Sequence, residues 1–220
     1  MISDALYEPV KQGECRENAV KKTFLSFILL ALGACPASAA TVAKSYSYFT
    51  VRGTTYDQIE DELAKRGPHV SSTGNRHPGA TRMAFTTKIG YAQDGSYCRI
   101  ASATTTVKVQ VILPKWRPRR KAEPDVRLFW DTLFADIKRH EEQHVDIAKA
   151  NARELEAKLK AVGRQKTCEI AQAKAKSVTE AALARHDRAQ AQFDRVETIN
   201  FESRILRLLR YRIEQQQAKK

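Results

Sequence analysis

The segment from Asp125 to Val162 limits most strongly what this chain can fold into, because it contains neither glycine nor proline. Its apolar residues recur at steps of three and four, which is the spacing of one face of an α-helix. This stripe consists of Leu133, Ile137, Ala148, Ala152, Leu155 and Leu159, and Gly163 stands where a helix would stop. A long helix with one apolar stripe needs another element to cover that stripe.

Two further helices are predicted after Gly163. One runs from about Thr167 to about Val196, and we expect it to pack against the first helix as an antiparallel hairpin. The other, Glu202–Lys220, intersperses arginines with leucines and isoleucines. This pattern predicts a separate basic amphipathic helix over residues 199–220, for which docking on the hairpin and contact with an anionic surface are both open.

The chain before Pro114 has a different pattern, rich in β-branched and aromatic residues that favour strands. Asp94-Gly95 is a strong hairpin signal, and Thr54 or Thr55 can cap a short helix that ends at Gly67. The predicted strands are Ser45–Val51, Thr81–Ala92 and Tyr97–Pro114. The sequence therefore predicts an α+β domain over residues 41–198, in which a small β-α-β-β unit with an antiparallel sheet precedes the helical hairpin.

Residues 1–40 have the order of a secretory signal peptide. Lys21 and Lys22 precede the apolar run Thr23–Ala34, and the small residues Ala37–Ala40 follow as a cleavage site. Cleavage there predicts a periplasmic or secreted protein. A second interpretation is a lipoprotein anchored at Cys35, because Leu32–Cys35 resembles a lipidation site.

Export affects how the remaining cysteines and the charge are interpreted. Cleavage would leave Cys98 and Cys168, and a single pair in an exported protein predicts a disulfide, with two free thiols as the alternative. The net charge of +13 is compatible with contact to an anionic membrane or cell-wall surface, and equally with a solvated surface. We expect no nucleic-acid partner, because no recognised nucleic-acid motif is present.

The predicted long helix contains the sequence His140-Glu141-Glu142-Gln143-His144. Residues four apart lie on one helix face, so neutral imidazoles at His140 and His144 can meet a single Zn²⁺. Glu141 would then take a proton from a zinc-bound water and pass it to the leaving nitrogen of a peptide bond. The competing interpretation is a charged helix whose histidines are satisfied within the core.

A third metal ligand is expected from the returning helix. If both helices are straight, the 1.5 Å rise per residue places Leu183–Arg188 opposite the motif. His186 is the geometric favourite, and Asp187, Glu180 and Asp194 are the other candidates.

Several segments resemble, in their order and spacing, a bacterial family of predicted secreted zinc-dependent proteases that is catalogued mainly as a domain of unknown function. They are VRGTTYDQIEDELAKRGP, RHPGATRMAFTTKI, VKVQVILPKW and FWDTLFADIKRHEEQHVDIA, followed by Cys168, within about Ser45–Thr198. The resemblance implies His140 and His144 as ligands, Glu141 as base, and a Cys98–Cys168 disulfide. Phe193-Asp194 only loosely matches the family's tyrosine–aspartate pair, and the His-Gly that follows in the family is absent.

The resulting expectation is a monomeric zinc metallopeptidase that acts on a peptide or protein substrate. A function of a different class remains open, namely a non-catalytic cell-envelope binding protein that keeps the fold with a structural or vestigial metal site.

Overall fold

The computed structural model describes residues 5–7, 11–12, 40–71 and 73–218 of the 220-residue chain. Nearly all of the predicted signal peptide, including its apolar run and Cys35, lies outside these ranges. The expectations of cleavage and of lipid attachment therefore stay predictions. No helix within these ranges is both long and apolar enough to cross a bilayer.

Three long strands form the main sheet, in the spatial order β6 (Ala80–Asp94), β7 (Tyr97–Trp116) and β3 (Thr41–Val51). The predicted hairpin joins β6 and β7 through Gly95, whose φ of 62° suits glycine. Two short segments, β1 (Ala5–Tyr7) and β2 (Lys11–Gln12), pair with the other edge of β6. The α+β class is confirmed, with strands and helices in the predicted order.

The sheet is mixed, so the expectation of a wholly antiparallel sheet was wrong in this detail. β3 pairs with β7 in parallel over its whole length, whereas β6 and β7 are antiparallel. The reason is topological, because β7 inserts between β6 and β3 and runs in the same direction as β3. Between β3 and β6 the chain forms α1 (Tyr56–Arg66), capped by Thr55, and a small hairpin of β4 (His69–Val70) and β5 (Asn75–Arg76).

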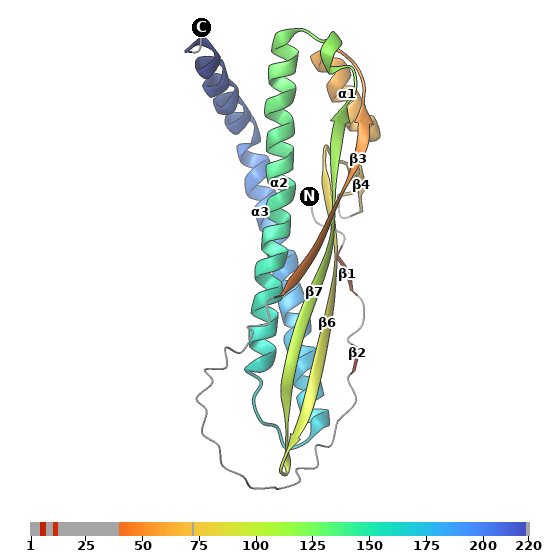
Figure 1. Ribbon diagram of the computed structural model, residues 1–220, viewed down its shortest axis with the longest axis vertical. Helices are drawn as coiled ribbons and strands as arrows, with labels where there is room; N and C mark the ends of the chain where they lie inside the picture. Colours follow the sequence, from red (N-terminus) through yellow and green to blue (C-terminus); the bar gives the residue numbers. More distant parts are fainter. Residues whose placement is uncertain (1–4, 8–10, 13–39, 72, 219–220) are drawn as a thin grey trace, which may run out of the picture.

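Two long helices, α2 (Pro124–Lys160) and α3 (Cys168–Gln217), run side by side along the sheet (Figure 1). A short 3₁₀ turn, η1 (Arg119–Lys121), precedes α2. The predicted stripe of α2 is buried against alternate residues of β7, including Val107, Val109 and Val111. Burial of such aliphatic side chains contributes about 1.5–3 kcal/mol each, so this layer is the main core.

The separate C-terminal helix predicted for residues 199–220 was wrong as an independent element. Those residues continue α3 as far as Gln217 without a break. The physical reason is that no glycine or proline interrupts the chain between Cys168 and Gln217. Ile205 of this segment is buried, and the neighbouring Arg204 binds Asp136 of α2.

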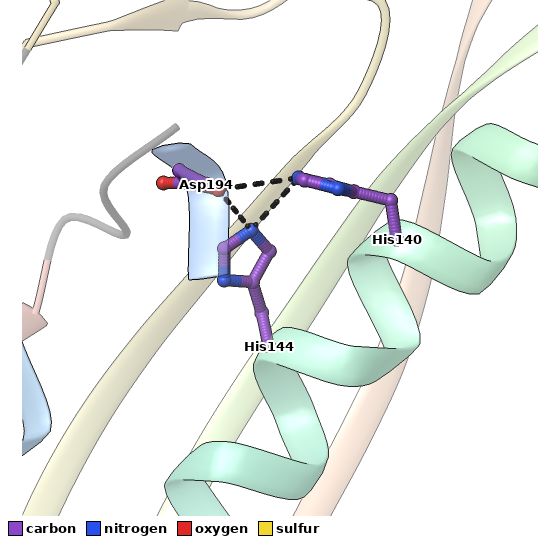
Figure 2. Close-up of side chains that lie close together, drawn as sticks. All are labelled: His140, His144 and Asp194. Atoms are coloured by element: carbon purple, nitrogen blue, oxygen red, sulfur yellow. Dashed lines mark hydrogen bonds and ion pairs between the residues drawn. The ribbon is translucent and has the colours of Figure 1, made fainter. Parts of the chain in front are cut away.

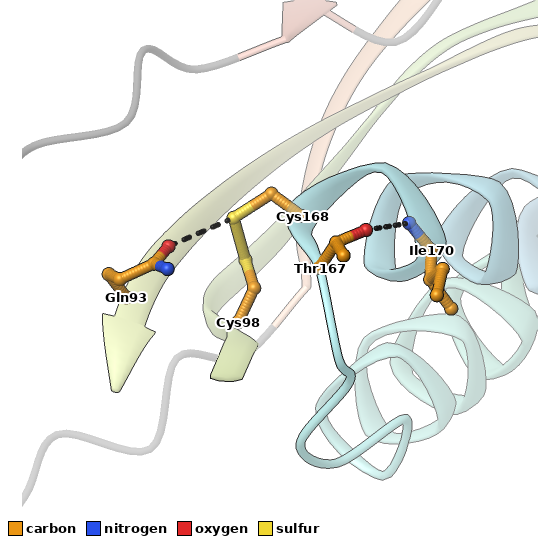
Figure 3. Close-up of a disulfide and its surroundings, with 5 residues drawn as sticks. All are labelled: Gln93, Cys98, Thr167, Cys168 and Ile170. Carbon is orange, nitrogen blue, oxygen red and sulfur yellow. Dashed lines mark hydrogen bonds between the residues drawn. A yellow bond between two sulfur atoms is a disulfide. The ribbon is translucent and has the colours of Figure 1, made fainter. Parts of the chain in front are cut away.

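A disulfide between Cys98 and Cys168 fixes the start of α3 to the tip of the β6–β7 hairpin (Figure 3). The connection that leaves α2 also pairs with this tip, because Gln165 and Cys98 exchange two backbone hydrogen bonds of 2.7 and 2.8 Å. The chain is thereby carried past the end of α2 before α3 begins (Figure 1). These contacts set the register of the two helices.

Candidate metal centre

His140 and His144 lie on successive turns of α2 and direct their rings toward Asp194 of α3 (Figure 2). The Nε2 atoms of the two histidines are 3.1 Å apart. Oδ1 of Asp194 lies 3.1 Å from Nε2 of His144 and 3.3 Å from Nε2 of His140. His144 and Asp194 are buried, and His140 is partly buried.

The spacing of these three donor atoms fits a small divalent cation. A tetrahedral ion with bonds of about 2.0–2.1 Å holds its donor atoms about 3.3–3.4 Å apart, close to the distances found here. Two histidine nitrogens and one carboxylate oxygen that converge in this way have the chemistry of a metal site. The three residues therefore form a group that could hold a metal ion.

Of the four candidates for a third ligand, Asp194 joins the two histidines and the other three do not. His186 is buried, but its Nε2 faces Nε2 of Gln190 at 2.9 Å and its Nδ1 lies 3.1 Å from Asp187. Asp187 is itself exposed, and Glu180 lies beside Lys176 on the surface. The geometric preference for His186 was wrong.

The error arose because α3 is shifted along α2 relative to the predicted alignment of the two helices. The prediction assumed a short turn from which two straight helices depart together. In the structure the α2–α3 connection extends to the hairpin tip, so α3 begins beyond the end of α2. His144 consequently lies opposite Gln190, one turn further along α3 than His186.

Each histidine also has a partner on its second ring nitrogen. Nδ1 of His144 lies 2.5 Å from Oε1 of the buried Gln190, whose Nε2 donates to the backbone oxygen of His144 at 3.1 Å. Nδ1 of His140 lies 3.5 Å from Oε2 of Glu197. Partners of this kind fix the ring orientation, and acceptors at Nδ1 keep Nε2 free to bind a metal.

These outer partners were not predicted from the sequence, although a signal for them exists. Gln190, Asp194, Glu197, Phe201 and Arg204 recur at steps of three and four, and so share one face of α3. Arg204 belongs to the segment that was predicted as a separate helix. It binds both carboxylate oxygens of the buried Asp136, through Nε at 2.8 Å and Nη2 at 3.1 Å.

Glu141 is completely buried beside the cluster. Its Oε2 accepts a hydrogen bond of 2.8 Å from Oγ1 of Thr81, while its Oε1 has no hydrogen-bond partner among the residues that the structure describes. Burial raises the pKa of this carboxyl group. Gly79 packs so closely that a Cβ atom there would lie 2.8 Å from Oε1, so the backbone at Gly79 confines the carboxylate.

Within the cluster the pKa of Asp194 is lowered and that of His144 is raised. Burial alone would raise the pKa of Asp194, but hydrogen bonds from His140 and His144 outweigh it and lower that pKa well below its usual range. For His144, burial acts to lower the pKa, and the contact with Asp194 outweighs it, so the pKa is raised. Asp194 is therefore ionised at neutral pH, with a negative charge directed at both rings.

The site is open to the outside through a pocket of about 590 Å³. The pocket is lined by Pro78, Asp136, Ile137, His140, Glu141, Glu197, Thr198, Phe201 and Arg204. His140 and Glu141 thus face a space that a ligand can enter, whereas His144 and Asp194 lie behind it.

Comparison with known proteins identifies one family. No curated protein and no solved structure shows a significant match to the chain. A family model described as a bacterial protein of unknown function (DUF922) matches residues 46–201. The matched range includes the three residues of the cluster as well as both cysteines of the disulfide. Because the match covers more than half of the chain, the protein belongs to this DUF922 family of bacterial proteins of unknown function.

Proposed function

We propose that this protein is a zinc-dependent peptidase, exported to the periplasm or beyond the cell, which hydrolyses peptide bonds. The observation that carries the proposal is the combination of three converging donor atoms with a buried carboxylate at one open pocket. Neither feature suffices alone, because buried histidine–aspartate groups also occur in structural networks.

The donor set favours zinc over other cations. Imidazole nitrogen suits zinc, copper, iron and nickel, whereas magnesium and calcium prefer oxygen ligands. Catalytic zinc sites typically have three protein ligands and one open position, and structural sites have four. Within the described part of the chain the cluster has three members, and His140 borders the pocket.

Glu141 is the residue that we assign as general base. A Zn²⁺ ion held by His140, His144 and Asp194 would supply Lewis acidity and would bring the pKa of a coordinated water toward about 7. Oε1 of Glu141 has no hydrogen-bond partner within the described ranges and would be available to accept a proton from that water, while Thr81 holds Oε2. Burial raises the pKa of Glu141, which favours its acceptance of a proton.

The remaining residues of the site would hold the ligands in place. Gln190 and Glu197 orient the two imidazoles through their Nδ1 atoms. Asp194 stays ionised and contributes a negative charge to the ligand set. Phe193 packs its ring 4.9 Å from that of His140 and 5.1 Å from that of His144, which limits the movement of both.

A Glu141→Gln variant tests this function, with Glu142→Gln as its matched control. Glu142 is the next residue, but it binds Lys44 at 2.7 Å and does not line the pocket. Zinc content is measured by elemental analysis, and hydrolysis is measured with a mixture of quenched fluorescent peptides. We expect one zinc per chain in all three proteins, and hydrolysis by the parent and Glu142→Gln only.

The same experiment separates the competing function, a non-catalytic cell-envelope protein with a structural or vestigial metal. That function predicts bound zinc without hydrolysis by the parent protein. Equal hydrolysis by the parent and by Glu141→Gln would remove Glu141 from the mechanism. Absence of zinc after reconstitution would remove the metal site itself.

A further inference from the structure

A second hollow adjoins the pocket at the metal centre. Its volume is about 930 Å³, and it shares Pro78 and Phe201 with the first pocket. Most of the remaining lining comes from α1, and the rest is Arg76 and two residues of α2, Phe129 and Leu133. We call this hollow the aromatic groove, because its lining includes three aromatic side chains, those of Tyr56, Phe129 and Phe201.

The walls of the aromatic groove are held in position without a ligand. The rings of Tyr56 and Phe129 meet edge to face, with 5.1 Å between centroids. The hydroxyl group of Tyr56 donates to Asp125 Oδ2 at 3.0 Å, which anchors α1 to the start of α2. Arg76 donates to the backbone oxygen of Gly67 at 2.7 Å. The groove is therefore preformed, as most ligand sites are.

The groove presents apolar side chains that are partly exposed in the described part of the protein. Tyr56 is 41% exposed and Phe201 is 44% exposed, although both line a concave surface. Apolar surface in a hollow next to polar groups is characteristic of ligand sites. The polar groups here are those of the metal centre. Its pocket adjoins the groove at Pro78 and Phe201, which line both hollows.

The distance along α3 relates the groove to the metal centre. Phe201 lies seven residues after Asp194, which is about 10 Å at 1.5 Å per residue and nearly the same helix face. An extended peptide advances about 3.3 Å per residue. A side chain seated against Phe201 therefore belongs to a residue within about three positions of the bond held at the metal centre.

We propose that the aromatic groove is a specificity subsite, which takes one large apolar side chain of a peptide substrate. The proposal rests on the peptidase function proposed above. It predicts that substrates with leucine, phenylalanine or tyrosine at a position within about three residues of the cleaved bond are preferred over substrates with alanine or aspartate at that position. Filling an apolar pocket of this kind typically discriminates by about 10- to 100-fold in kcat/KM.

Two variants alter the groove in opposite ways. Phe201→Ala removes one wall, and Ala64→Phe fills the groove from an exposed position of α1 without touching the core. Each has a matched control outside both hollows. Tyr211→Ala removes an exposed aromatic ring from the same helix, and Lys65→Phe adds a ring at the next position of α1.

The values of kcat/KM are compared for sets of peptides that differ at a single position, which is varied in turn over the three residues on either side of the cleaved bond. We expect the parent and both controls to prefer the apolar peptides by about 10-fold or more. Phe201→Ala and Ala64→Phe should both lose most of this preference while they keep their zinc. Ala64→Phe, which lies outside the pocket at the metal centre, should also cleave the alanine peptide at the parental rate. Absence of a preference in the parent, or an equal loss on all peptides, would overturn the proposal.

A binding measurement separates failure of the groove from failure of the peptidase function. Zinc-loaded Glu141→Gln is titrated with the same peptides by fluorescence anisotropy, alone and combined with Ala64→Phe. Tighter binding of apolar peptides that Ala64→Phe abolishes supports the subsite even if the parent hydrolyses nothing. Equal binding of all peptides, or a dimer in light scattering that Ala64→Phe dissociates, would contradict it.

Discussion

Oδ1 of Asp194 lies 3.1 Å from Nε2 of His144, and this contact joins α3 to the helix that carries the histidine pair. The predicted consequence is that Asp194→Asn loses most of its affinity for zinc, because an amide replaces the charged ligand. The loss should exceed the roughly 10–100-fold that removal of an outer partner causes. Competition with a chromophoric chelator measures this affinity.

The matched control for Asp194→Asn is Asp187→Asn on the same helix. Asp187 is exposed and contacts His186 rather than the cluster. It should bind zinc as the parent does. A comparable loss in both variants would show that the effect arises from the charge of α3 and not from coordination.

A substitution of Gln190 tests how much the acceptor beside Nδ1 of His144 contributes to zinc affinity. Gln190→Leu keeps a similar volume but removes the acceptor that faces Nδ1 of His144. We expect zinc affinity to fall by about 10–100-fold, with one zinc per chain still bound at saturation. Gln192→Leu, at an exposed position two residues further on, is the control and should leave the affinity unchanged.

Zinc affinity is also expected to depend on pH in a defined direction. The pKa of His144 in the metal-free protein is raised above 6.5 by its contact with Asp194, which outweighs the effect of burial. A protonated imidazole cannot bind a metal, so a proton must leave as zinc enters. Affinity should be nearly constant above this raised pKa and fall by up to about tenfold per pH unit below it.

Asp194 should not contribute to this fall near neutral pH, because its pKa is lowered and it stays ionised. Chelator competition from pH 8 to pH 5, corrected for protonation of the chelator, gives the profile. An affinity that remains constant down to pH 5 would contradict the assignment of His144 as a ligand.

The features of the fold and site that depend on local periodicity could be predicted from the sequence. Alternation along β7 identified the buried valines, such as Val107, and the four-residue step identified His140 and His144 as neighbours. Both periods follow from backbone geometry alone. Glycine and proline positions likewise marked the start and end of α2 correctly.

The features that were missed depend on distant contacts. His186 was preferred over Asp194 because the register of two helices depends on the path of their connection, which pairs with residues far away in sequence. The parallel pairing of β3 depends on where β7 inserts. The spacing of Gln190 and Asp194 places both on one face of α3, but it does not show that this face lies opposite His144, because that depends on the register of the two helices.

The disulfide offers a test of how the helix register is maintained. Replacement of both Cys98 and Cys168 by alanine opens a crosslink across 70 residues. In the chain-entropy model this costs about 4 kcal/mol of unfolding free energy, with about 2–4 kcal/mol typical in practice. Denaturant unfolding of the metal-free protein measures the loss.

The same double variant should keep most of its zinc affinity while it remains folded. The contacts of Gln190 with His144 and of Arg204 with Asp136 lie several turns after the start of α3 and do not involve the disulfide. They hold Asp194 opposite the histidines even if the first turns of α3 loosen. A large loss of affinity in protein that circular dichroism shows to be folded would mean that the covalent link, and not the packing of the two helices, positions the third ligand.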